Sequence, residues 1–244
     1  MCFWPAHRLL LLLCCSLMAV LWARPGFGHS LWVDGSGEHY TVHRGHTLET
    51  PQPYAPAAVT SIRAFDRDGA ELSIERVDET DRVRFRTAST TALAAVRCDW
   101  GGRVNTTRGR KLMTRREAEE KGYKVVESFS SIQTSKTFFG DGPVVCTRLG
   151  MPFEFVPVKS PSDLSPGEPL ALRLFFRGAL LEDALVFWGA DRQTRTDAEG
   201  IARIPLPQQP GRHMIAARHT APAEGRDTDS DYDQYMTFVV FEVK

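Results

Sequence analysis

Hydrophobic and polar residues alternate along most of the chain after residue 28, in short runs that end at turn residues. Leu31 and Val33 alternate with their neighbours in one run, and Tyr40 and Val42 do so in the next. A period of two residues places successive side chains on opposite faces of a β-strand. Turn signals recur about every ten residues, a spacing typical of β-sandwiches. The pattern therefore predicts an all-β protein.

The strand pattern falls into two series, which predict two β-sandwich domains over residues 29–148 and 149–244. The first series contains a long insertion near 101–140, where basic and polar residues replace the alternation. Residues 114–121 in this insertion can form a short helix with Thr114 as its N-cap. Irregular stretches of this length are usually binding loops or mobile insertions. The second series has about six or seven short strands and no evident helix, as expected for a small sandwich.

The first 28 residues differ from the rest and predict a secretory signal peptide. His7 and Arg8 precede an uncharged, mostly apolar run of fourteen residues, Leu9 to Trp22, and small residues lead to a cleavage site after Gly28. A run of this length is too short to cross a bilayer comfortably, although an uncleaved anchor is the alternative. We therefore expect a periplasmic or secreted protein whose mature chain has no membrane span.

Composition agrees with a folded, exported chain. Its 244 residues can enclose a sizeable core, and 42% of them are hydrophobic and 25% charged. Removal of residues 1–28 takes away Arg8 and Arg24 and no acidic residue, so the mature net charge becomes −2, with 28 basic against 30 acidic residues. A nucleic-acid partner is not expected, because binding to phosphates requires a basic face. The run of basic residues over 108–116 could attract a smaller anion, or could simply be solvated surface.

The mature chain has two cysteines, Cys98 and Cys146. An even pair in an exported protein predicts a disulfide between them. A cysteine-containing metal site is the alternative. It has less support, because the spacing lacks the paired CxxC motif of such sites.

Four of the seven histidines lie within eighteen residues, at His29, His39, His43 and His46. Cleavage after Gly28 would make His29 the new N-terminus, so that its α-amine and its imidazole ring could coordinate one metal ion together. Neutral imidazole is a common metal ligand and suits nickel, cobalt, copper and zinc. His39 and His43 would share the polar face of one strand, where a pair of solvated histidines is the simpler interpretation.

Two further histidines, His213 and His219, are six residues apart and would share one face of a strand. His213 is interpreted as a covered, hydrogen-bonded side chain, whereas His219 lies where the strand is expected to run out toward an open edge. The sequence therefore predicts a metal site made of His29, His46 and His219, which would require the two domains to meet.

Three motifs in the second series resemble those of a transthyretin-like or carboxypeptidase-regulatory-like module. They are GALLEDA at 178–184, TDAEGIA at 196–202 and PGRH at 210–213. The resemblance implies an immunoglobulin- or transthyretin-like second domain.

The whole mature chain adds three more motifs, HSLWV at 29–33, LGMPFEFVP at 149–157 and TFVVFEV at 237–243. With the signal peptide, they resemble a bacterial family of periplasmic accessory proteins associated with nickel and cobalt uptake. The resemblance implies nickel or cobalt as the bound ion, with copper possible, and a membrane metal-uptake transporter as a partner. His29 and His219 match the pattern of this family, whereas His46 rests on local spacing alone.

Three functions follow as hypotheses. The first is a non-enzymatic protein that binds a transition metal outside the cytoplasm and assists its uptake. The second is a copper-dependent oxidative enzyme that uses the N-terminal histidine, and the third is a structural or adhesive sandwich protein in which the histidines are incidental. The sequence lacks the motifs of serine hydrolases, phosphate-binding glycine loops and paired zinc ligands, so hydrolase and nucleotide-binding functions have no support.

Overall fold

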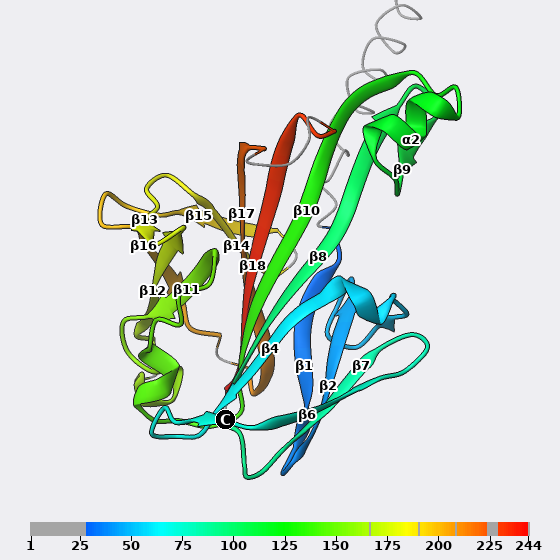
Figure 1. Ribbon diagram of the computed structural model, residues 1–244. Helices are drawn as coiled ribbons and strands as arrows, with labels where there is room; N and C mark the ends of the chain where they lie inside the picture. Colours follow the sequence, from blue (N-terminus) through cyan, green and yellow to red (C-terminus); the bar gives the residue numbers. More distant parts are fainter. Residues whose placement is uncertain (1–27, 166, 190, 208, 224–228, 244) are drawn as a thin grey trace, which may run out of the picture.

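The computed structural model describes residues 28–165, 167–189, 191–207, 209–223 and 229–243 (Figure 1). The predicted all-β class is confirmed, because these residues form three β-sheets and one short α-helix. The proposed signal peptide lies outside the described residues except for Gly28. Within the described ranges, no helix is long and apolar enough to cross a membrane.

The central sheet contains nine strands. Eight follow the order β15, β14, β17, β18, β10, β8, β4 and β5, and β9 pairs with β8. Their bounds, in that order, are Arg192–Arg195, Leu185–Trp188, Gly211–Pro222, Tyr232–Val243, Val125–Phe138, Leu93–Thr106, Val59–Phe65, Glu71–Leu72 and, for β9, Gly109–Lys111. Figure 1 shows β18, β10 and β8 as the longest arrows.

Two smaller sheets cover the central sheet. The first sheet has the order β1 (Ser30–Ser36), β2 (His39–Gly45), β7 (Val83–Thr87) and β6 (Ile74–Asp78), with β3 (Pro51–Gln52) beside β2. The other sheet joins β11 (Phe153–Pro157), β12 (Pro169–Phe176), β13 (Ala179–Leu180) and β16 (Ile201–Pro205). Short 3-10 helices, η1 to η3, span Pro56–Ala58, Pro143–Cys146 and Pro161–Asp163.

The central sheet combines strands from both predicted domain ranges. β10 pairs with β18 in parallel, with Phe129 opposite Tyr232 and Thr137 opposite Val240. β8 and β4 come from the first range, and β17 and β14 from the second, so one hydrogen-bonded sheet crosses the expected boundary at residue 148.

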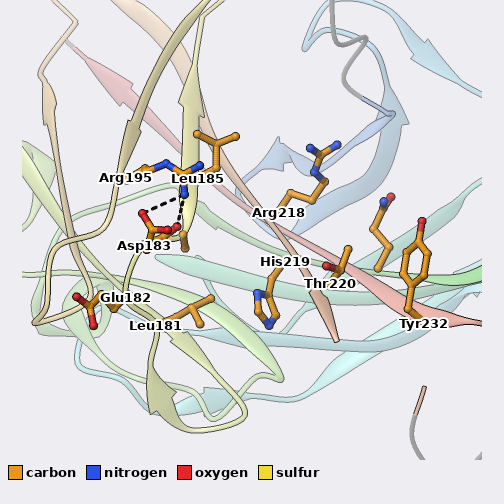
Figure 2. A pocket seen from close by; sticks show the side chains of 11 residues that line it. Leu181, Glu182, Asp183, Leu185, Arg195, Arg218, His219, Thr220 and Tyr232 are labelled. Atoms are coloured by element: carbon orange, nitrogen blue, oxygen red, sulfur yellow. Dashed lines mark hydrogen bonds and ion pairs between the residues drawn. The ribbon is translucent and has the colours of Figure 1, made fainter. Parts of the chain in front are cut away.

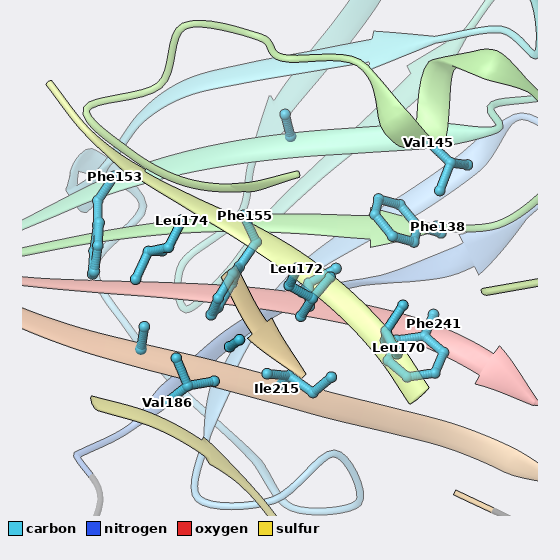
Figure 3. Packing of buried hydrophobic residues seen from close by; sticks show 14 of the residues in the cluster. Phe138, Val145, Phe153, Phe155, Leu170, Leu172, Leu174, Val186, Ile215 and Phe241 are labelled. Atoms are coloured by element: carbon cyan, nitrogen blue, oxygen red, sulfur yellow. The ribbon is translucent and has the colours of Figure 1, made fainter. Parts of the chain in front are cut away.

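Alternate residues of the central strands face two separate hydrophobic clusters. On β18, Tyr235 and Val239 belong to the cluster shared with β11 and β12, whereas Met236 and Phe238 belong to the cluster shared with β1 and β2. Figure 3 shows the first of these, in which aromatic and aliphatic side chains from both sheets interdigitate. The molecule is thus a stack of three sheets, with the central sheet contributing one face to each cluster.

The stretch expected to be an insertion differs from that expectation. Residues 93–106 and 125–138 form the long paired strands β8 and β10 at the centre of the sheet. Between them, the predicted short helix is confirmed as α2 (Arg115–Glu120), capped by the hydroxyl of Thr114. Glu117 completes a capping box by accepting from the Thr114 backbone N–H.

The predicted disulfide was wrong, because both cysteines are free. Cys98 is fully buried on β8 in the cluster shared with β1 and β2. Cys146 ends η2, directly after Val144 and Val145, which belong to the other cluster. The two thiols are therefore on different sides of the central sheet, and the even count of cysteines carried no information about that placement.

A buried ion pair joins β10 to β11. Lys136 is 2% exposed and Glu154 is 1% exposed, and the Lys136 ammonium forms an ion pair with the Glu154 carboxylate. Lys136 Nζ also donates to the Thr147 carbonyl oxygen at 3.0 Å. The carboxylate accepts from the backbone N–H groups of Leu149 and Met151 at 2.6 and 3.1 Å. These bonds satisfy both charges inside the protein.

Candidate functional site

His29 and His46 lie side by side at one end of the β1–β2 hairpin. The two strands pair antiparallel, with Ser30 opposite Gly45. His29 comes directly before Ser30 and His46 directly after Gly45, so the register itself places the two histidines opposite each other. Their ring centroids are 4.3 Å apart and the rings are tilted by 32°.

Both ring nitrogens of His29 have hydrogen-bond partners. The guanidinium Nη2 of Arg44 lies 2.8 Å from Nδ1, and the side-chain oxygen of Gln52 lies 2.6 Å from Nε2. A guanidinium can only donate, so Nδ1 accepts and the proton of the neutral ring is on Nε2. Burial, and next the charge of Arg44, lower the pKa of His29. The ring is therefore held neutral, in the form that binds metals.

The structure does not bring His219 to these two residues. His219 lies on β17 opposite Tyr235, on the face that packs against β11 and β12. His29 is on the other face, where its carbonyl oxygen accepts from Gln133 at 2.8 Å. Gln133 also contacts Met236, which belongs to the cluster shared with β1 and β2. The central sheet therefore separates His219 from His29 and His46.

His219 instead borders a cleft of about 530 Å³. Its ring packs on Phe176 with centroids 4.4 Å apart, and Figure 2 shows it between Leu181 on one side and Thr220 and Tyr232 on the other. Asp183, at the opposite wall, forms an ion pair with Arg195 at 3.0 Å. Burial, and next the charge of Arg177, lower the pKa of His219.

The remaining histidines of the described chain lie apart from the His29–His46 pair. His39 is exposed at the start of β2, and His43 stacks on Trp32 with ring centroids 5.5 Å apart. His213 is half-buried and its Nε2 lies 2.8 Å from the carbonyl oxygen of Gln209, which fits the hydrogen-bonded role expected for it. Among the described residues, no group of three or more His, Cys, Asp or Glu side chains is arranged to hold a metal ion.

A second cleft, of about 450 Å³, lies beside His29 and was not anticipated from the sequence. Arg44, which contacts His29, lines it together with Arg103, Trp100 and Tyr54. Both arginines lie outside the basic run over 108–116 noted above. Only the long-range packing of β8 against the first sheet brings these side chains together, so no local pattern could have identified them.

The lowered pKa of His219 predicts a pH-dependent contribution to stability. In the unfolded chain the imidazole takes up its proton near 6.5, before the folded protein does, so stability should fall as the pH drops below that value. In His219→Leu, which keeps an apolar contact with Phe176, this part of the fall should be absent. Urea unfolding of both proteins, about one pH unit on either side of 6.5, measures the difference. Equal losses in the two proteins would contradict the prediction.

Comparison with known proteins identifies the family but assigns no activity. Residues 27–221 match a family model described as a domain of unknown function (DUF4198). No curated protein and no solved structure matches the chain. The matched range runs from the residue before Gly28 almost to the end of β17 and so includes the hairpin, the cleft beside His29, most of the cleft beside His219 and most of the three sheets. The chain therefore belongs to the DUF4198 family of uncharacterised domains.

Proposed function

We propose that this protein is exported and binds a divalent transition metal ion at His29 and His46. The observation that carries the proposal is the 4.3 Å separation of the two imidazole rings. Cleavage after Gly28 would add the α-amine of His29 as a third nitrogen ligand. Three nitrogens from two residues would then meet at one end of the β1–β2 hairpin, without a contribution from His219.

The geometry around the two rings is compatible with this coordination. His46 is exposed, so its ring can turn about its side-chain bonds to direct a nitrogen at an ion held by His29. Metal–nitrogen bonds of about 2.0–2.1 Å are within reach from this starting separation. The hydrogen bond between Nε2 of His29 and Gln52 can remain, and such outer partners orient a ligating histidine and raise its basicity.

Chelation by the amine and ring of His29 requires Nδ1, which accepts from Arg44 in the absence of metal. An incoming ion must therefore displace the Arg44 guanidinium. That side chain also packs on the ring of Trp100, with its central carbon 4.8 Å from the ring centroid, and can keep this contact while it releases Nδ1. Metal binding in the proposal is thus coupled to a movement of Arg44 toward the cleft that it lines.

The resemblance to nickel and cobalt uptake proteins supports one of those two ions as the cargo and a membrane transporter as its recipient. Imidazole and amine nitrogens suit both ions, and affinity for such ligands rises from cobalt to nickel to copper. Copper is therefore the competitor to include in every titration.

The proposal predicts that mature protein beginning at His29 binds nickel or cobalt, and that His29→Ala and His46→Ala each weaken binding. We expect a loss of at least about a hundredfold for His29→Ala, because even removal of an outer-sphere partner costs about 10–100-fold. The measurement is calorimetric titration with each ion, after mass analysis has identified the N-terminal residue.

His219→Ala is the matched control, because its ring is on the other face of the central sheet. It should leave the affinity unchanged. Equal affinities for wild type, His29→Ala and His46→Ala would contradict the proposed site, and a loss confined to His219→Ala would move the site to the other face.

A further inference from the structure

We propose that the cleft bordered by Arg44 and Arg103 is a binding site for a small organic anion that carries a carboxylate on a flat, apolar body. This proposal goes beyond the metal site, because the cleft is lined by other residues than His29 and His46 and contains the positive charges of two arginines. It is lined by residues of β2, the β3–η1 segment, η1, β8, the loop before α2 and α2 itself, and all of its lining residues are described by the structure.

The positive charge of the cleft is not neutralised within the described chain. No ion pair connects Arg44 or Arg103 to a carboxylate there. Both side chains are half-buried, and burial lowers the pKa of each, with the charge of Arg44 lowering that of Arg103 further. Asp99 has the opposite but smaller effect on Arg103. Two guanidiniums that are partly removed from water and repel each other favour an anion between them.

Donors remain available on both guanidiniums. Arg44 uses Nη2 for His29, and Arg103 uses Nη1 for the carbonyl oxygens of Trp100 and Gly102 at 2.6 and 2.8 Å. The other guanidinium nitrogens have no acceptor among the described residues. The same is true of the buried indole N–H of Trp100, a residue that lines the cleft. A carboxylate accepts such donors in pairs, which is the geometry that arginine recognises best.

The remaining walls suit a flat apolar body. Trp100 and Tyr54 meet edge to face with centroids 5.7 Å apart, and Pro53, Ala55, Ala58 and Met113 line the same space. Glu117 is the one acidic residue of the lining, and its carboxylate is engaged in the capping box of α2. A volume of about 450 Å³ lies within the roughly 300–1,000 Å³ of small-molecule sites.

The test uses metal-free protein in the presence of a chelator, with benzoate as the probe and inorganic phosphate as the competing anion. We expect benzoate to bind and phosphate to bind more weakly. Arg103→Met should weaken benzoate binding roughly tenfold to a hundredfold, since it removes charge-assisted hydrogen bonds. Arg103→Lys, which keeps the charge and loses the fork of donors, should retain part of the affinity.

Arg218→Met is the matched control, because Arg218 lines the other cleft. Its benzoate affinity should equal that of the wild type, and thermal unfolding establishes that each variant is folded. Absence of benzoate binding by the wild type, equal binding by folded Arg103→Met, or a loss in Arg218→Met alone would each overturn the assignment. Phosphate binding as tight as benzoate binding would overturn the carboxylate class. Because no metal is present, failure of the proposed metal site does not affect the outcome.

Discussion

Lys136→Met is expected to lower the free energy of unfolding by about 3–5 kcal/mol. The substitution leaves the Glu154 carboxylate, 1% exposed, without its cation in the interior. The carboxylate still accepts hydrogen bonds from two backbone N–H groups, but these cannot replace a full positive charge. Burial lowers the pKa of Lys136, and the charge of the nearby Glu154 opposes that effect. Urea unfolding at neutral pH measures the loss.

A double variant and a surface variant make this prediction specific. Lys136→Met combined with Glu154→Leu removes both charges, and should recover most of the lost stability, because apolar residues often replace a buried ion pair at little cost. Lys159 and Glu168 form an exposed ion pair at 3.2 Å, so Lys159→Met should cost at most about 1 kcal/mol. Equal losses for Lys136→Met and Lys159→Met would contradict a special role for the buried pair.

Phe155→Ala should cost about 3–5 kcal/mol, because it removes a ring from the centre of the cluster between β11, β12 and the central sheet. Phe155 is 1% exposed, and Figure 3 shows its ring among Leu172, Leu174 and other apolar side chains. The substitution leaves a cavity, and this cavity cannot collapse fully because the surrounding strands are closely packed. Thermal and urea unfolding measure the effect.

Val158→Ala is the matched control for this cavity, since Val158 follows β11 directly and is 45% exposed. We expect a change within about 0.5 kcal/mol for this surface position. The loss of stability in Phe155→Leu should lie between the losses in Phe155→Ala and Val158→Ala. A loss in Phe155→Ala no larger than that in Val158→Ala would show that the ring contributes little to the core.

The strand pattern predicted the fold class well, because the alternation of apolar and polar residues is a local property of each strand. Tyr40 and Val42 are buried while His39 is exposed, as the period of two requires. The capping signal at Thr114 was equally local, and it located α2. Local patterns did not reveal which strands pair, so the sequence offered no sign that β10 and β18 join the two halves in one sheet.

Residues 128–136 of the expected insertion are polar and yet form part of the central strand β10, for a physical reason. A polar side chain can also be buried when its polar group finds a hydrogen-bond partner, and several residues of this stretch find theirs in distant segments. Thr134 donates to the Phe153 carbonyl oxygen at 2.5 Å, and Gln133 donates to that of His29. Such partners depend on the finished fold, so a polar central strand resembles a loop when it is seen in the sequence alone.

The histidine site shows the same division between local and long-range information. The proximity of His29 and His46 follows from one hairpin and its register, and both were predicted as ligands. The involvement of His219 assumed that two domains would meet at an edge. The intervening sheet could not be foreseen without knowing that β17, β18 and β10 are neighbours.

The parallel pairing of β10 with β18 also affects how the chain reaches its folded state. Strand β18 lies in the middle of the largest sheet, with β17 on one side and β10, about a hundred residues earlier, on the other. An incomplete chain therefore lacks the element that closes both hydrophobic clusters, and contacts this remote in sequence slow folding. For the exported protein that we propose, late closure would leave the polypeptide extended while it crosses a membrane and let it fold on the far side.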